Sequence, residues 1–213
     1  MRVKVCGMTR LDQIRRLEEL GVEFAGLIFY ARSPRFVGKS SLEPEVLRRE
    51  RLNINKVGVF VNATLDEVLK TVELWRLHMV QLHGDESVKF CEQVSSHVTT
   101  VKAFRVSGGE DLLWRIHSYR EVSDMFLFDS AGAAYGGNGV PFDWGTLAET
   151  DVDKPFFLSG GIGPEDAERV VEFAGRQSDL FAVDVNSRFE TAPGVKDMRK
   201  VEDFCRSLGI RGT

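Results

Sequence analysis

The feature of this sequence that most constrains its fold is a regular alternation between short apolar runs and amphipathic stretches. The runs are rich in Val, Ile, Leu and Phe, and they lie at 2–8, 24–30, 56–62, 79–84, 99–106, 124–130, 155–161 and 179–186. They show little alternation of apolar with polar residues. Strands covered by helices on both faces have this character, because neither face meets water. The runs are therefore predicted to form a parallel sheet.

The stretches between the runs carry the signals of helix ends. Thr9 precedes a stretch with leucines at helical spacing, and Gly21 can end that helix. Thr64 and Glu67 have the spacing of a capping box, and a third helix is predicted to open at Pro164 and close at Gly175. The predicted helices span 11–20, 41–52, 65–77, 85–95, 109–120, 143–149, 165–175 and 196–208.

Eight strand–helix units in one chain of 213 residues leave two α/β architectures. An open doubly wound sheet is possible, but a small (β/α)₈ TIM barrel, with eight parallel strands inside a ring of helices, accommodates eight repeats better. No linker or shift in composition divides the chain. We therefore predict a single barrel domain over residues 1–213.

Charge and composition exclude several classes of function. The chain has 28 Lys and Arg against 32 Asp and Glu, for a net charge of −4, whereas nucleic-acid binding depends on surplus basic residues. No apolar run reaches the roughly 18 residues needed to cross a membrane, and the first residues do not resemble a signal peptide. The three cysteines, Cys6, Cys91 and Cys205, are far apart, which argues against a disulfide framework or a zinc site. A cytoplasmic protein without a metal is predicted.

Barrel enzymes carry their chemistry where the strands end, at the C-terminal face. The polar and small residues predicted at those ends are Cys6, Arg35, Gln81, His83, Asp129, Gly160, Gly161, Asp184, Asn186 and Ser187. A mixture of thiol, carboxylates, guanidinium and glycines is unusual for a packing layer.

For each of three groups among these residues, two interpretations remain open at this point. Cys6 is either a small buried apolar residue or a thiol at the barrel mouth. Asp129 is either a cap for the following loop or an acid, and its place at a strand end favours the acid. The pair Gly160 and Gly161 suits either an ordinary turn or a phosphate held by backbone N–H groups, together with Asn186 and Ser187.

Several segments of the chain, in collinear order, resemble the phosphoribosylanthranilate isomerase family. They are KVCGMTR (4–10), GLIFYARSPRFV (26–37), KVGVFVN (56–62), QLHGDE (81–86), FDSAGAAYGGNGVPFDW (128–144), LSGGI (158–162) and VDVNSRFETAPGVKD (183–197). The resemblance implies a single (β/α)₈ barrel without a cofactor, acting in the third step of tryptophan biosynthesis. The implied reaction is an Amadori rearrangement, from N-(5'-phosphoribosyl)anthranilate to 1-(2-carboxyphenylamino)-1-deoxyribulose 5-phosphate.

The resemblance also implies a role for each candidate residue. Asp129 matches the general acid and Cys6 the general base, which requires some thiolate and hence electropositive surroundings. Arg35 matches the arginine that holds the anthranilate carboxylate. The phosphate cradle matches Gly160, Gly161, Asn186 and Ser187, while Asp184, Gln81 and His83 match other substrate-binding positions. The implied partner is a small phosphorylated substrate, and the implied assembly is a monomer or a homodimer.

The chain departs from the family pattern at two places. Arg188 stands where many members have glycine, which puts the number of N–H groups at the phosphate in doubt, and residues 136–139 read GGNG in place of GGTG. Two alternatives remain: a related sugar-phosphate barrel isomerase or epimerase, and a barrel that binds a phosphorylated ligand without turnover. The presence of Cys6 speaks against a two-aspartate isomerase, and the pairing of Cys6 with Asp129 speaks against loss of catalysis.

Overall fold

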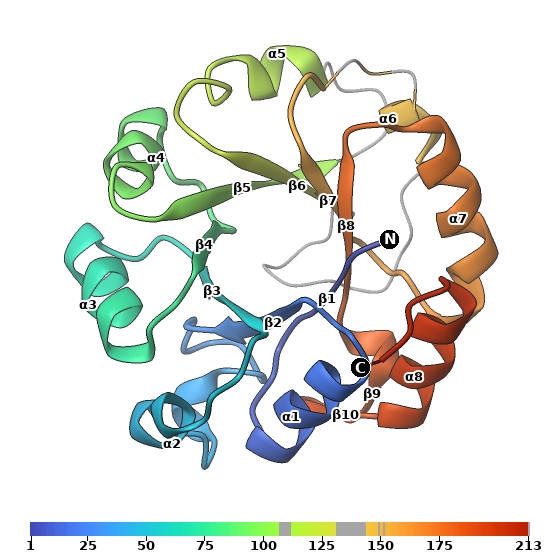
Figure 1. Cartoon of the computed structure of the whole chain (residues 1–213). Helices are drawn as coiled ribbons and strands as arrows, with labels where there is room; N and C mark the ends of the chain where they lie inside the picture. Colours follow the sequence, from blue (N-terminus) through green and yellow to red (C-terminus); the bar gives the residue numbers. More distant parts are fainter. Residues whose placement is uncertain (107–111, 131–143, 149, 151, 213) are drawn as a thin grey trace.

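The computed structural model describes residues 1–106, 112–130, 144–148, 150 and 152–212. Eight parallel strands follow one another in chain order around a closed barrel, in which β1 pairs with both β2 and β8 (Figure 1). The strands are β1 Val3–Val5, β2 Phe24–Ile28, β3 Asn55–Phe60, β4 Met79–Leu82, β5 Thr99–Val106, β6 Met125–Ser130, β7 Phe156–Leu158 and β8 Leu180–Val185. The predicted (β/α)₈ barrel is confirmed, and the open sheet is excluded.

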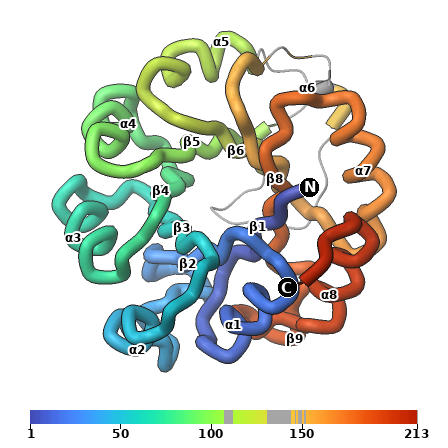
Figure 2. Tube along the Cα trace, viewed as in Figure 1, coloured from blue at the N-terminus to red at the C-terminus, as the bar shows by residue number. Residues whose placement is uncertain are grey.

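Helices surround the strands as an outer ring (Figure 2). They are α1 Leu11–Glu19, α2 Pro44–Arg49, α3 Leu65–Trp75, α4 Val88–Ser95, α5 Leu112–His117, α6 Gly145–Ala148, α7 Ala167–Arg176 and α8 Met198–Ser207. The predicted capping box begins α3, because Thr64 and Glu67 exchange side-chain and backbone hydrogen bonds. Gly21, with φ +77°, follows the end of α1 as predicted.

Three of the predicted helix-end signals are wrong. Thr9 does not cap α1; Arg10 precedes the helix, and the Thr9 hydroxyl donates to the carbonyl of Gly194 at 2.5 Å. Pro164 opens a separate 3₁₀ turn, η2 (Pro164–Asp166), and α7 follows it. Gly175 lies within α7, which ends one residue later at Arg176. A long-range contact redirects Thr9, and local sequence shows no such contact.

The inside of the barrel is filled in layers. An apolar layer contains one or two residues from each of β2 to β8: Phe24, Val57, Met79, Val101, Ala103, Leu127, Phe157 and Ala182. Side chains on a strand return to the same face every second residue. The next inward positions are therefore Val59, Gln81, Asp129 and Asp184, two residues beyond Val57, Met79, Leu127 and Ala182. The barrel is closed by apolar packing below and lined by polar groups above.

Short elements lie near the C-terminal face, and of these the sequence predicted only the short helical turn that follows Asn186 and Ser187. They are two 3₁₀ turns, η1 (Val37–Lys39) and η3 (Ser187–Phe189), and an antiparallel hairpin of β9 (Glu190–Ala192) and β10 (Val195–Lys196). The hairpin is attached to α1, because the amide of Gln13 donates to the carbonyl of Lys196 at 2.7 Å. Elements of two or three residues are too short to leave a periodic signal.

Parts of the sequence-based predictions lie outside the described residues. These are the GGNG loop at 136–139, the start of the helix predicted at 109–120, and the beginning and end of the helix predicted at 143–149. Within the described residues, no helix is both long enough and apolar enough to cross a membrane.

Candidate active site

A cavity of about 330 Å³ opens at the C-terminal ends of the strands. All ten candidate residues from the sequence line it: Cys6, Arg35, Gln81, His83, Asp129, Gly160, Gly161, Asp184, Asn186 and Ser187. They come from the ends of β1, β4, β6, β7 and β8 and from the loop after β2. Closure of the barrel therefore brings together residues up to 181 positions apart, between Cys6 and Ser187.

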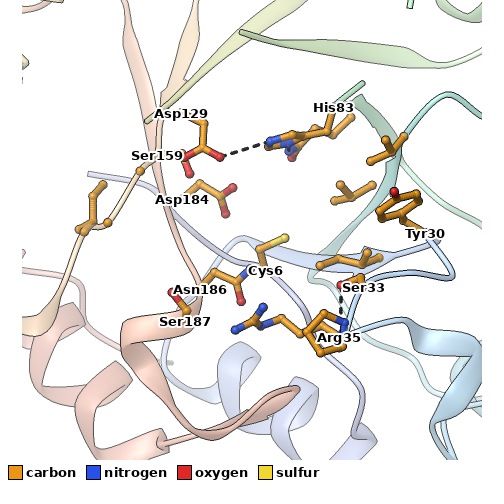
Figure 3. Close-up of a pocket in the computed structure, with 18 of the residues that line it drawn as sticks. Cys6, Tyr30, Ser33, Arg35, His83, Asp129, Ser159, Asp184, Asn186 and Ser187 are labelled. Atoms are coloured by element: carbon orange, nitrogen blue, oxygen red, sulfur yellow. Dashed lines mark hydrogen bonds and ion pairs between the residues drawn. The ribbon is translucent and has the colours of Figure 1, made fainter. Parts of the chain in front are cut away.

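Cys6 follows β1 directly and points into the cavity (Figure 3). Its N–H donates to the carbonyl of Val185 at 2.9 Å, which fixes the backbone beneath the thiol. Gly26 on the neighbouring strand leaves room for the sulfur, since a Cβ atom there would lie 2.9 Å from the Cys6 Sγ. The thiol is therefore buried, and it faces the cavity at the barrel mouth.

The charges around Cys6 act in opposite directions on its thiol. Burial raises the pKa of Cys6, the nearby ammonium of Lys4 lowers it, Asp184 raises it and Lys196 lowers it, and the pKa is raised overall. The predicted electropositive surroundings are present in Lys4 and Lys196. Burial outweighs the effect of these two ammonium groups on the pKa of Cys6, so the thiol form predominates at neutral pH.

The raised pKa predicts how Cys6 reacts with a small alkylating reagent such as iodoacetamide. Only the thiolate is nucleophilic, and with a pKa above the ordinary value of 9.0 its fraction at pH 7 is below about one part in a hundred. The alkylation rate of Cys6 is expected to rise continuously from pH 7 to pH 9.5. Mass spectrometry of the modified peptide measures it, with Cys6→Ser as the background. A plateau below pH 8 would contradict the predicted direction of the shift.

Lys4 and Asp184 form a buried ion pair beneath the cavity, with 2.8 Å between Nζ and Oδ2. Burial raises the pKa of Asp184, Lys4 lowers it and Asp129 raises it, and the result is a raised pKa. Oδ1 of Asp184 is buried and accepts no hydrogen bond within the described part of the chain. Because Asp184 also lines the cavity, this oxygen is available to a ligand hydroxyl.

Asp129 is the second-to-last residue of β6, and its carboxylate has neighbours on two sides. Its Oδ1 accepts from the N–H of Ser130 at 2.9 Å, and its Oδ2 lies 3.2 Å from Nε2 of His83 (Figure 3). The His83 Nε2 is not aligned for a hydrogen bond to the carboxylate. Gln81 Nε2 lies 2.6 Å from Nδ1 of His83. If the amide donates to Nδ1, the imidazole carries its proton on Nε2, the nitrogen that faces Asp129.

Arg35 reaches the cavity from the loop after β2. Its stem passes over Gly7, where a Cβ atom would lie 2.7 Å from Cδ of Arg35, and Gly7 has φ +75°. The guanidinium forms a two-pronged ion pair with Glu190, at 2.9 Å from Nε to Oε1 and 2.7 Å from Nη2 to Oε2. Sequence reasoning placed Arg35 correctly at the mouth but did not predict this partner.

The loops after the neighbouring strands β7 and β8 both line the cavity. Gly160 and Gly161 have φ of +93° and +70°. In the part of the chain described, the N–H groups of Gly160, Gly161 and Ile162 donate to no acceptor. Unpaired N–H groups at a barrel mouth are the usual means of holding a phosphate. Asn186 and Ser187, which follow β8, line the same cavity.

Arg188, the departure from the family pattern, lies at the edge of this cradle. Its guanidinium forms an ion pair with Glu165 of η2, and a Cβ atom on Gly163 would lie 2.7 Å from its Nε. The side chain therefore ties the loop after β8 to the loop after β7. The N–H of Gly163 is taken by Asp166 at 2.7 Å, so that donor is not available to a ligand.

Sequence reasoning missed two groups of residues. Tyr30, Ser33 and Ser159 also line the cavity, and Tyr30 and Ser33 lie within the segment 26–37 already singled out. Glu190 and Lys196 stand behind the cavity, in the segment 183–197. In the described ranges no cluster of three or more His, Cys, Asp or Glu side chains could hold a metal ion.

The fold and the cavity define a class of protein: a (β/α)₈ barrel enzyme whose mouth carries a thiol, a carboxylate and backbone N–H groups that are unpaired within the described residues. Comparison with known proteins narrows that class. The family model for N-(5'-phosphoribosyl)anthranilate isomerase matches residues 3–207. The isomerase of that name from Parabacteroides distasonis is 39% identical over 98% of this chain and 93% of its own.

Solved structures agree with this match. Monomers generated from the dimeric phosphoribosylanthranilate isomerase of Thermotoga maritima superpose with a TM-score of 0.81, at 32% identity over 98% of both chains. A phosphoribosylanthranilate isomerase in complex with reduced 1-(o-carboxyphenylamino)-1-deoxyribulose 5-phosphate gives 0.81, at 30% identity over 98% of both chains. The chain belongs to the N-(5'-phosphoribosyl)anthranilate isomerase family. It is an aldose–ketose isomerase of tryptophan biosynthesis.

Proposed function

We propose that Cys6 and Asp129 are the general base and the general acid of this isomerisation, with N-(5'-phosphoribosyl)anthranilate bound between them. One observation carries the proposal: a thiol after β1 and a carboxylate at the end of β6 line the same cavity, beside a cradle of unpaired N–H groups. An acid and a base on different strands reach different atoms of one substrate, as the reaction requires.

The proposed chemistry has three steps. Asp129 gives a proton to the furanose ring oxygen, the bond from that oxygen to C1 breaks, and C1 becomes the carbon of a protonated Schiff base. Cys6, as thiolate, then removes the proton from C2, and the electron pair forms the C1–C2 double bond of an enolamine. The enolamine gains a proton at C1 and loses one from the C2 hydroxyl, which leaves the ketone.

The same proposal assigns the binding groups. The phosphate is held by the N–H groups of Gly160 and Gly161, together with Asn186 and Ser187. The free Oδ1 of Asp184 accepts from a ribose hydroxyl, since it lies in the cavity without a partner among the described residues. This role explains why a carboxylate is kept in a buried position, where the ammonium of Lys4 compensates its charge.

The direct test of the proposed function is conversion of the substrate. Loss of anthranilate-type fluorescence on mixing with the purified chain measures the reaction, and it is expected to proceed equally with and without a chelator. Activity that disappears with the chelator would contradict the predicted absence of a cofactor. No conversion at all would contradict the proposed substrate.

Arg35 is proposed to bind the anthranilate carboxylate, because a guanidinium matches a carboxylate at two points. Arg35→Ala is expected to raise the KM of the substrate about 30-fold, the loss of one charge-assisted contact of about 2 kcal/mol. Steady-state kinetics measures the KM, and calorimetry should give unchanged binding of inorganic phosphate. Arg15→Ala is the matched control, because Arg15 forms a similar two-pronged pair with Glu50 away from the cavity. Parental kinetics in Arg35→Ala would exclude the assignment.

We also propose that residues 1–213 act as one domain in the cytoplasm, as a monomer or a homodimer. The dimer is supported by the relative from Thermotoga maritima, which is described as dimeric. Light scattering of the purified chain distinguishes the two assemblies, and cell fractionation tests the location.

A further inference from the structure

We propose that Glu190 positions Arg35, holding one edge of its guanidinium so that the other edge is presented to the aromatic carboxylate. This inference rests on the proposed function of Arg35 and adds a residue that makes no contact with the cavity. On this proposal, selectivity for a substrate with an aromatic carboxylate depends on Glu190 in the hairpin β9–β10 as well as on Arg35 in the loop after β2.

The geometry of the ion pair carries the first step. Glu190 accepts from Nε at 2.9 and 3.0 Å and from Nη2 at 2.7 Å, so it occupies the side edge of the guanidinium. Within the described residues, Nη1 of Arg35 donates to no acceptor. A guanidinium has a second edge, formed by Nη1 and the remaining hydrogen of Nη2, that matches a carboxylate equally well. That edge is left for a ligand.

Glu190 is itself held in a fixed place. Its Oε1 accepts from Nζ of Lys196 at 2.7 Å and from the N–H of Gly194 at 3.1 Å, and its side chain is 4% exposed. Burial raises the pKa of Glu190, but the combined effect of Arg35 and Lys196 in the other direction is larger. The pKa is therefore lowered overall, and the carboxylate is ionised at neutral pH. Arg35 therefore has a rigid partner, and its long side chain loses conformational freedom before the substrate arrives.

The charge balance of this group also fits an anionic ligand. Lys196 and Arg35 face the single carboxylate of Glu190, and the Lys196 ammonium also donates to Oδ1 of Asn186 at 2.7 Å. Burial lowers the pKa of Lys196, and the carboxylate of Glu190 acts against that shift. While Lys196 keeps its proton, two cations against one anion leave one positive charge at the mouth. The carboxylate of the substrate would neutralise it.

Hydrogen bonds that do not involve the side chain of Glu190 hold the hairpin β9–β10 in place. Gln13 exchanges two hydrogen bonds with the backbone of Lys196, at 2.7 and 3.0 Å, and Thr9 donates to the carbonyl of Gly194 at 2.5 Å. The N–H of Asp197 donates to the carbonyl of Phe189 at 2.8 Å. These bonds fix the segment from both sides, so a change at Glu190 acts first on Arg35.

The test compares two substrates: N-(5'-phosphoribosyl)anthranilate and its aniline analogue, which lacks the carboxylate. The parent is expected to prefer the first by a large ratio of kcat/KM, and Arg35→Ala should lose most of that ratio. Glu190→Gln keeps the volume but weakens the pairing, and it should reduce the ratio about 10-fold, mainly through KM. On the Arg35→Ala background it should reduce the ratio no further, because the two residues act as a unit.

Two further variants complete the design. Glu50→Gln breaks the similar pair with Arg15 on the outside of the barrel and should leave the ratio unchanged. Glu190→Asp keeps the charge but is one methylene shorter; it should give an intermediate ratio, and it replaces Glu190→Gln if that variant does not fold.

The outcomes separate this inference from the function beneath it. If the parent converts neither substrate, the proposed function fails, and the inference fails with it. If the parent discriminates through Arg35 while Glu190→Gln and Glu190→Asp lower kcat/KM equally for both substrates, Glu190 is merely structural. In that case the inference alone is overturned.

Discussion

Replacement of Cys6 by serine is expected to lower kcat about 10²–10⁴-fold while leaving the KM nearly unchanged. Serine keeps the shape of the side chain, so the substrate still fits between the loops. Its hydroxyl is far less acidic than a thiol, so it cannot supply the anion that removes the proton from C2. A change in kcat at constant KM is the signature of an interaction needed only in the transition state. Steady-state kinetics at saturating substrate measures it.

The matched control for this variant is Cys91→Ser. Cys91 is another buried thiol, and it lies in the outer core on α4. The side chain of Ser123 lies close to Cys91, and its buried Oγ has no hydrogen-bond partner within the described residues, so a serine hydroxyl at position 91 can pair with it. The kcat of Cys91→Ser is expected to stay at the parental value. If both serine variants lose activity alike, the loss reflects a damaged fold and not a missing base.

Replacement of Asp129 by asparagine is expected to lower kcat by a similar factor of about 10²–10⁴, for a different reason. The amide oxygen can still accept from the N–H of Ser130, which now meets Oδ1 at 2.9 Å. The amide cannot transfer a proton to the ring oxygen, so the ring stays closed and the Schiff base does not form. Rapid-mixing fluorescence of the bound substrate, together with kcat, measures the block at this step.

Asp124→Asn is the control for Asp129→Asn. Asp124 precedes the same strand at its other end and accepts from the N–H of Thr100 at 2.7 Å. The two variants make the same chemical change to a carboxylate that accepts a backbone N–H. Loss of activity confined to Asp129→Asn supports the acid. Equal loss in both would indicate a general cost of the substitution.

The barrel could be predicted from the sequence because its strands are buried on both faces. Seven of the eight apolar runs contain the strand found, and β3 begins at Asn55, one residue before its run. The strand ends then follow from topology, so the candidate side chains meet at one mouth. Interactions between distant segments could not be predicted from the sequence. Thr9 was assigned to a helix cap, and only the fold shows that it bonds to Gly194.

The residues that line the site could be predicted from the sequence, but their pKa values and their pairing could not. The composition of the strand ends identified Cys6 and Arg35. It did not indicate that burial would outweigh Lys4 in setting the pKa of the thiol. Nor did it connect Arg35 with Glu190, since 155 residues separate them and the hairpin that carries Glu190 is too short to predict. Burial and pairing are properties of the assembled barrel.

The division of labour between Cys6 and Asp129 is the central claim, and one comparison tests it most directly. An analogue without the 4'-hydroxyl cannot close the furanose ring, so it enters the reaction as the open Schiff base. Single-turnover rates on this analogue and on the natural substrate are measured for Cys6→Ser and Asp129→Asn. The open analogue is expected to restore much of the rate in Asp129→Asn and none in Cys6→Ser. Equal rescue of both variants, or a near-parental rate in Cys6→Ser on the natural substrate, would contradict the assignment of acid and base.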